Sequence, residues 1–94
     1  MNDSPLTDAE IDTALAQLPQ WSRSGEHLCK DFVFADFKSA LAFMVRAGFE
    51  AEAWNHHPEW SNVYNRVEVR LNTHSAGGKI TAKDVDLATA FDGV

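Results

Sequence analysis

The chain has 94 residues, a length typical of one domain, and its single cysteine, Cys29, excludes an internal disulfide. Its formal net charge of −6, from 8 basic and 14 acidic residues, leaves no basic stripe for direct nucleic-acid binding. Hydrophobic residues make up 45% of the chain, yet no stretch approaches the roughly 18 apolar residues of a membrane span, so we expect one globular domain over residues 1–94.

The first predicted element is a short helix over Thr7–Leu18. Thr7 is followed three residues later by Glu10, and this capping-box pattern satisfies two backbone N–H groups at a helix start. Apolar residues then recur at helical spacing, and Pro19 ends the helix.

The second predicted element is a hairpin over Trp21–Phe34, in which Gly25 supplies the turn. Lys30 interrupts the apolar alternation of the second strand. His27 lies in this hairpin without a neighbouring catalytic motif, so we expect it to be a surface residue. The apolar side chains that share one side of the strand are Leu28, Phe32 and Phe34.

The third predicted element is a long helix that Asp36 caps and that runs to about Asn55. Pro58 stops it, because the residue before a proline avoids helical angles. Phe43, Ala47 and Phe49 lie off its main apolar face, so we expect burial on two sides, against the sheet and against another subunit. The main face carries Phe37, Ala40, Leu41, Met44, Val45 and Gly48.

The fourth predicted element is a second hairpin, over Trp60–His74, with His74 at the end of its second strand. Residues 67–73 alternate between apolar or threonine side chains and polar ones, as in a strand with one buried face. We expect the turn at Tyr64-Asn65-Arg66, since asparagine tolerates left-handed backbone angles.

The last predicted element is a helix over Ala82–Asp92, which follows a loop at Gly77-Gly78. Thr81 is its cap, and Asp84 is the third residue of a capping box. The order of helix, hairpin, helix, hairpin and helix predicts an α+β domain with a four-stranded antiparallel sheet and three helices on one face.

Two adjacent histidines, His56 and His57, stand where the long helix breaks. Histidine exchanges protons near neutral pH, and the break lets the two rings point in different directions into one cavity. The second hairpin returns the chain, so His74 can converge on the pair. Glu52 precedes His56 by four residues, and on a shared helix face its carboxylate would orient the imidazole. The pattern is therefore compatible with a histidine acid–base site.

Other interpretations of the histidines stay open at this point. Paired histidines at a helix end also occur as capping or surface residues. A zinc site would need three or four ligands, and the sequence has neither an HxxxH nor a CxxC pair. The residues that could be counted as zinc ligands are His56, His57, His74 and Glu52.

The tryptophans have two interpretations as well. Trp21, Trp54 and Trp60 could stack on a flat heterocycle, but core packing explains them equally and is favoured for Trp54. Asp84 is explained most simply by helix capping, which is compatible with a second role in a site.

The run HHPEWSNVYNRV over 56–67, followed by Leu71-Asn72-Thr73-His74 and Gly77-Gly78, resembles the signature of the pterin-4a-carbinolamine dehydratase family. The stretch from Phe34-Ala35-Asp36-Phe37 to Phe43-Met44 is similar to that family's long helix and its entry. The resemblance covers nearly the whole chain, from Thr7 to Phe91. It implies the same α+β fold and a hydro-lyase that needs no cofactor and no metal.

The resemblance also implies a reaction. Aromatic amino acid hydroxylases leave their tetrahydropterin as a 4a-hydroxy adduct, and the dehydratase removes water from it to give the quinonoid dihydropterin. The resemblance implies that His56 and His74 form the acid–base pair and that His57 is also catalytic. The residues it implies as substrate contacts are Glu52, Trp21, Trp60 and Asp84.

Several expectations concern partners and location. The resemblance implies a pterin substrate, a homodimer or homotetramer, and a functional link to an aromatic amino acid hydroxylase. Animal relatives also serve as dimerisation cofactors of a homeodomain transcription factor, and dehydratase-like proteins serve molybdenum-cofactor metabolism, so both remain alternatives. The segment Met1–Pro5 lacks a signal-peptide core, which favours a cytoplasmic location. The sequence departs from the family at Asn55, where animal members carry an acid, and in a loop over 75–80 that is one residue longer.

Overall fold

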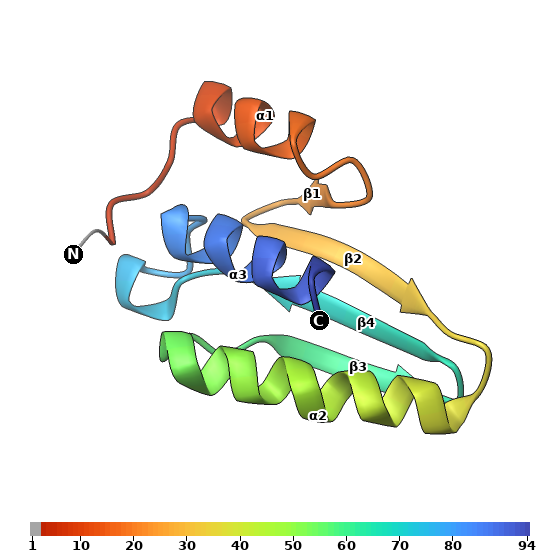
Figure 1. Ribbon diagram of the computed structural model, residues 1–94. Coiled ribbons are helices and arrows are strands. Elements are labelled where there is room, and N and C mark those ends of the chain that lie inside the picture. Colours follow the sequence, from red (N-terminus) through yellow and green to blue (C-terminus); the bar gives the residue numbers. More distant parts are fainter. Residues whose placement is uncertain (1–2) are drawn as a thin grey trace.

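Four antiparallel strands in the order β1-β2-β4-β3 form the sheet of the computed structural model, which describes residues 3–94 (Figure 1). Each strand pairs with its neighbour in antiparallel register, and the central pair aligns Phe32 with Val67. The elements in chain order are α1 (Asp8–Ala16), β1 (Ser22–Ser24), β2 (His27–Val33), α2 (Phe37–Trp54), β3 (Glu59–Val63), β4 (Arg66–Leu71), the short 3-10 turn η1 (His74–Ala76) and α3 (Ala82–Asp92).

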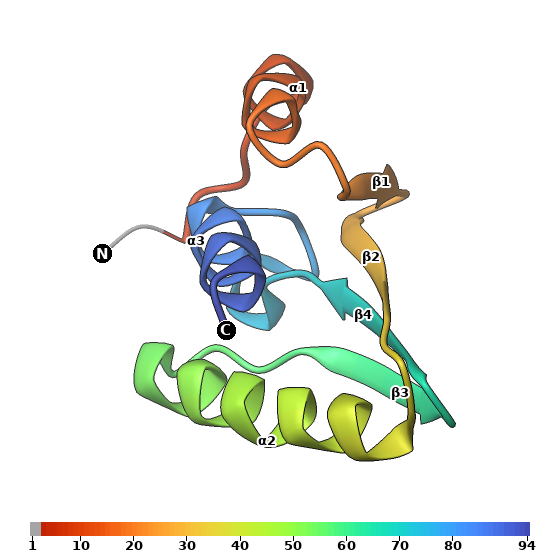
Figure 2. The ribbon, with the colours of Figure 1, turned by 45° about the vertical axis from the view of Figure 1, so that its right-hand side comes forward.

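The core lies between the sheet and two of the helices. Figures 1 and 2 show α2 and α3 side by side on one face of the sheet, with α1 beyond α3 and near β1. The rings of Phe43 on α2 and Phe91 on α3 meet edge to face at 6.2 Å. Val67, Val69 and Leu71 are fully buried beneath them, which confirms the period-two prediction for β4 and the α+β fold.

The three predicted helix starts are also confirmed. Thr7 and Glu10 form the expected capping box, with hydrogen bonds of 2.8 and 3.1 Å. The Asp36 carboxylate accepts from the Ser39 backbone N–H at 2.8 Å, and this bond lowers the pKa of Asp36. Thr81 and Asp84 form the capping box of α3. These helix starts can be predicted from the sequence because each capping hydrogen bond joins residues no more than three positions apart.

The predicted core face of α2 is corrected by the structure. The core-facing residues of α2 are Ala40, Phe43, Ala47 and Ala51. Leu41 and Val45, which the spacing assigned to the main face, are 47% and 52% exposed. Because α2 is apolar around much of its circumference, the helical period does not distinguish the face that meets the sheet from the face that does not.

The turn of the second hairpin lies at Tyr64 and Asn65 as predicted, but two local details of the prediction are wrong. The left-handed residue of its turn is Tyr64, at φ 50°, rather than Asn65. Asn65 is held instead by a side-chain hydrogen bond of 2.9 Å to the carbonyl of Phe34, a contact 31 residues away that local pattern does not reveal. In addition, β4 ends at Leu71, so His74 begins η1 and does not end a strand.

Lys30, the residue that interrupts the alternation of β2, has a partner on α3. Its Nζ lies 2.7 Å from Oδ1 of Asp92 and 4.2 Å from the centre of the Phe32 ring. Nε1 of buried Trp21 donates to the same Asp92 carboxylate at 3.0 Å. Asp92 therefore provides a partner for both the Lys30 ammonium group and the Trp21 N–H on the core side of the sheet.

Replacing Asp92 with alanine should lower the free energy of unfolding by about 1–3 kcal/mol, because the buried Trp21 N–H would lose its acceptor. Chemical denaturation measures this change. Asp86→Ala is the matched control, since Asp86 lies exposed on the same helix and has no hydrogen bond or ion pair within residues 3–94. Equal changes in the two variants would contradict the structural role given to Asp92.

Candidate active site

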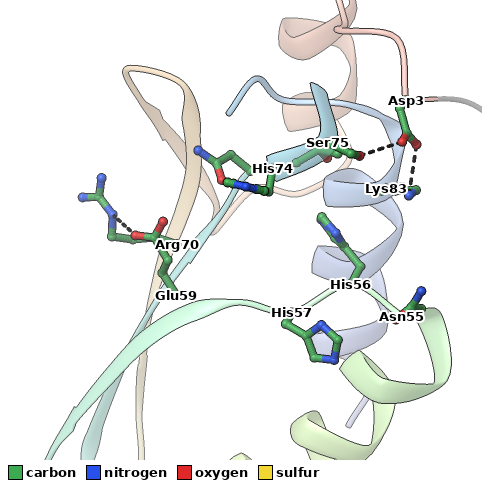
Figure 3. A pocket seen from close by; sticks show the side chains of 11 residues that line it. Asp3, Asn55, His56, His57, Glu59, Arg70, His74, Ser75 and Lys83 are labelled. Carbon is green, nitrogen blue, oxygen red and sulfur yellow. Dashed lines mark hydrogen bonds and ion pairs between the residues drawn. The ribbon is translucent and has the colours of Figure 1, made fainter. Parts of the chain in front are cut away.

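A cavity of about 590 Å³ lies where the end of α2, the end of β4 and the start of α3 meet (Figure 3). Its volume is in the range of cavities that hold small organic ligands. All three predicted catalytic histidines line it, which brings together residues separated by up to 18 positions in the sequence. The lining residues are Asp3, Asn55, His56, His57, Glu59, Arg70, Asn72, Thr73, His74, Ser75 and Lys83.

The end of α2 separates the two adjacent histidines. Asn55 takes a left-handed conformation at φ 52°, and the His56 N–H bonds back to the Ala51 carbonyl at 3.0 Å. Asparagine adopts such a conformation at a helix end more readily than most residues. Figure 3 shows the consequence, because the His56 ring points toward the region between His74 and Lys83 while the His57 ring points away from it.

His56 is held from behind by a buried carboxylate. Its Nε2 lies 2.6 Å from Oδ1 of Asp84, and the Asp84 side chain is fully buried. The other carboxylate oxygen accepts from the Thr73 hydroxyl and from the Thr81 backbone N–H, each at 2.9 Å. With Nε2 bound to Asp84, Nδ1 is the ring nitrogen of His56 that remains for a ligand. Asp84 is therefore a cap of α3 and an orienting group for His56 at once.

His57 forms a second histidine–carboxylate pair, but at the surface. Its Nε2 lies 2.9 Å from Oε1 of Glu52, and the two side chains are 58% and 79% exposed. The expectation that Glu52 orients His56 is corrected, because the left-handed turn at Asn55 takes His56 off the helix face that carries Glu52. An exposed pair of this kind contributes little to stability.

His74 is presented by a short loop that the backbone ties down. The neighbouring Thr73 pairs with Lys79, its N–H bonding to the Lys79 carbonyl at 2.8 Å, and Gly77 takes a left-handed angle of 72° that closes the turn. The His74 side chain is exposed, and within residues 3–94 no side-chain hydrogen bond holds its imidazole. Both ring nitrogens of His74 are therefore available to a bound substrate.

The tryptophans do not line the cavity. Trp21 is buried against Phe32, and Trp60 stacks on Phe91 with ring centres 6.2 Å apart. Their predicted contact with substrate stays a prediction, while the structure places both in the core. The expectation that Trp54 packs in the core is wrong, because this side chain is 50% exposed.

Several cavity residues carried no signal in the sequence. Asp3 accepts from the Ser75 hydroxyl at 2.6 Å and lies 3.0 Å from Nζ of Lys83, and these two hydrogen bonds lower the pKa of Asp3. On the other side, Glu59, Arg70 and Asn72 border the cavity. For Arg70 and Asn72, the alternation in the sequence predicted only that they lie on the polar face of a strand.

Between residues 3 and 94, no group of three or more His, Cys, Asp and Glu side chains is placed so that it could hold a metal ion. No helix in the same range is both long enough and apolar enough to cross a membrane.

The fold and the cavity together define a small α+β protein with a histidine site at the end of a helix and an adjacent loop. The family model described as pterin 4 alpha carbinolamine dehydratase matches residues 4–94. The chain belongs to this family, as the signature in the sequence implied.

Individual relatives agree with this assignment. A relative from Opitutus terrae, named for pterin-4-alpha-carbinolamine dehydratase, is 58% identical over 93% of this chain and 90% of its own length. One of the same name from Novosphingobium aromaticivorans is 50% identical over 98% of this chain and 97% of its own length. The crystal structure of a transcriptional coactivator/pterin dehydratase from Brucella melitensis is similar at a TM-score of 0.91, with 39% identity over 96% of this chain and 97% of that chain.

Proposed function

We propose that this protein is a hydro-lyase that dehydrates a 4a-hydroxytetrahydropterin to the quinonoid dihydropterin by histidine acid–base catalysis. The observation that carries the proposal is the convergence of His56, His57 and His74 on one cavity, with His56 oriented by buried Asp84. Membership of the dehydratase family supports the same reaction. The direct test is an assay in which carbinolamine decay is followed with and without the protein.

The reaction requires two proton transfers. A general acid gives a proton to the hydroxyl on C4a, the C4a–O bond breaks and water leaves. A general base takes the proton from N5, and the N5–H electrons form the C4a=N5 double bond. The atoms balance with water as the only other product, and positioned proton transfer typically contributes roughly 10²–10⁴-fold to such a step.

His56 and His74 are the proposed acid–base pair. Asp84 binds Nε2 of His56 and so leaves Nδ1 for a ligand, while His74 presents a ring with no competing hydrogen bond among residues 3–94. His57 lines the cavity beside them, with Glu52 limiting the orientations of its ring. Two imidazoles of different surroundings suit a reaction that needs one donor and one acceptor of protons.

The product and substrate suggest the place of this activity in a cell. A 4a-hydroxytetrahydropterin arises when a pterin-dependent hydroxylase activates oxygen, so we infer that the protein works beside an aromatic amino acid hydroxylase in the cytoplasm. A hydroxylase assay with limiting pterin, with and without this protein, tests the link through the total product formed.

Self-association is proposed through α2. Four of its apolar side chains, spaced four residues apart, form an exposed stripe, and such patches mark interfaces. This α2 stripe, with the exposed fraction of each residue, consists of Phe37 (45%), Leu41 (47%), Val45 (52%) and Phe49 (72%). A second subunit seated on this stripe would bury the helix on a second side, as we expect from the sequence.

Replacing Leu41 with glutamate should convert the assembly to smaller species, because the new carboxylate would lose its hydration in the middle of the stripe. Sedimentation equilibrium measures the mass. Arg46→Glu, at an exposed position of the same helix outside the stripe, is the control that should keep the parental mass. An unchanged mass for Leu41→Glu would place the interface elsewhere.

A second candidate function is suggested by one relative. The similar structure from Brucella melitensis is called a transcriptional coactivator as well as a pterin dehydratase. An exposed apolar stripe could serve a heterologous partner as well as a second copy of this chain. If Leu41→Glu disperses the assembly but keeps full turnover, the stripe is free to serve such a role.

A further inference from the structure

The loop that carries His74 is anchored at its base. Thr73 and Lys79 pair across it as an antiparallel bridge, with the Thr73 N–H bonded to the Lys79 carbonyl at 2.8 Å. Inside the loop, the Gly77 N–H donates to the carbonyl of His74 at 3.0 Å. These bonds fix the ends of the loop and its curvature, but they do not join its tip, residues 74–76, to another part of the molecule.

Asn72 and His27 hold the same base from the side. Nδ2 of Asn72 donates to the Gly78 carbonyl at 3.1 Å and lies 3.0 Å from Nε2 of His27. The expectation that His27 is a surface residue is wrong, since its side chain is only 18% exposed and contacts the residue that supports this loop. These contacts again lie at the base, so the position of the tip depends on other residues.

Asp3 joins the tip of the loop to a helix. Its Oδ2 accepts from the Ser75 hydroxyl at 2.6 Å, and its Oδ1 lies 3.0 Å from Nζ of Lys83 in the first turn of α3 (Figure 3). Within residues 3–94, the bond from Ser75 to Asp3 is the one side-chain hydrogen bond that residues 74–76 make. The tip is therefore held through a single carboxylate.

The segment before α1 brings Asp3 to this place. The Leu6 N–H donates to the Ile80 carbonyl at 2.9 Å, and the Leu6 side chain packs against the hydrophobic core. With the chain fixed at Leu6, Asp3 lies three residues earlier and next to Ser75. The contact is thus supported by the fold on both sides and does not rest on one side-chain pair alone.

This link relates the two histidines of the proposed acid–base pair to one turn of α3. Asp3 contacts the residue after His74 on one side and the residue before Asp84 on the other. The Asp84 carboxylate in turn lies 2.6 Å from Nε2 of His56. Both histidines are therefore tied to the first turn of α3, and the Asp3 link sets the distance between them.

That distance affects the reaction more than the Asp3 ion pair affects the fold. A displacement of about 1 Å in a catalytic group can lower a rate roughly 100-fold. The Asp3 and Lys83 side chains are 29% and 36% exposed, and an ion pair with that much contact to water contributes little to stability. We therefore expect the loss of Asp3 to change turnover more than stability.

We propose that Asp3 is a positioning residue, which holds the His74 loop at the distance from His56 that the two proton transfers require. The inference rests on the proposed dehydratase function. Asp3 acts through Ser75 on the placement of His74 and not on the substrate. Removing it should therefore lower kcat and leave KM nearly unchanged.

The test is a double-mutant cycle with His74. Asp3→Ala should lower kcat roughly 10–100-fold in the parent protein, with KM and the melting temperature nearly unchanged. In His74→Ala, the same substitution should have no further effect on kcat, because the group that Asp3 positions is gone. An equal loss in both backgrounds would show that Asp3 acts elsewhere and would overturn the proposal.

Ser75 and Asp8 supply the matched variants. Ser75→Ala removes the other half of the link and should lower kcat as Asp3→Ala does, whereas Ser75→Thr keeps a hydroxyl and should retain the parental kcat. Asp8→Ala is the control, since Asp8 also forms an ion pair, with Arg23 at 2.7 Å, but does not line the cavity. A loss in Asp8→Ala equal to that in Asp3→Ala would contradict a specific role for Asp3.

NMR relaxation of the backbone amides gives a readout that does not depend on turnover. The order parameters of Ser75 and Ala76 should fall in Asp3→Ala, while that of Lys79, at the base, stays the same. Unchanged order at the tip would overturn the proposal. An inactive parent protein would overturn the dehydratase function and the positioning role with it. An active parent with an equally active Asp3→Ala would overturn the positioning role alone.

Discussion

Replacing His74 with alanine is expected to lower kcat roughly 10²–10⁴-fold, the usual contribution of a positioned proton donor or acceptor. The fold should be unaffected, because the His74 side chain is exposed and makes no side-chain hydrogen bond within residues 3–94. Stopped-flow absorbance of the decaying carbinolamine gives kcat, and thermal unfolding of the same sample gives the stability.

Added imidazole separates the chemical role of His74 from a structural one. A free imidazole can enter the open space left by the alanine and transfer the proton, so turnover should rise with imidazole concentration in His74→Ala but not in the parent protein. Full activity of His74→Ala at an unchanged stability would remove this residue from the mechanism and leave His56 and His57 to carry it.

The second large effect is expected at Asp84. Alanine at this position should lower the free energy of unfolding by about 3–5 kcal/mol, because three buried groups would lose their acceptor and each such loss costs about 1–3 kcal/mol. The change breaks three contacts at once, to the His56 ring, the Thr73 hydroxyl and the Thr81 N–H. Turnover should fall as well, because His56 would lose the group that fixes its orientation. Denaturation with urea and the dehydration assay measure the two effects.

Glu52→Ala is the matched control, since Glu52 also pairs with a histidine but at the surface. Its removal should change the free energy of unfolding by at most about 1 kcal/mol. If Asp84→Ala leaves the protein too unstable to assay, Asp84→Asn preserves the shape and should still reduce turnover. Equal destabilisation by Asp84→Ala and Glu52→Ala would contradict the buried network described around His56.

Much of this fold can be predicted from the sequence because its helix starts and strand faces depend on residues that are close together in the chain. The capping box of Thr7 and Glu10 and the strict alternation over Val67, Val69 and Leu71 each depend on neighbours a few residues apart. The convergence of His56, His57 and His74 could also be predicted, because a hairpin joins the helix end to the loop that carries His74.

The parts that could not be predicted depend on contacts between distant elements. His56 and Asp84 are 28 residues apart, and their pair exists because the start of α3 meets the end of α2. The core face of α2 is set by the shape of the sheet beneath its alanines and not by its helical period. Arg70 lies on the polar side of β4, where alternation indicates solvent, and only the packing of the loop after β4 makes that side a cavity wall.

The most direct test of the central claim is the rate of carbinolamine decay at neutral pH. A hydroxylase generates the carbinolamine from its tetrahydropterin, and its absorbance is followed with the purified protein, with His74→Ala and with buffer alone. The account predicts that the parent protein accelerates the decay in proportion to its concentration and that His74→Ala largely abolishes the acceleration. A decay rate equal to that in buffer, from a folded protein, would contradict the assignment of this cavity to pterin dehydration.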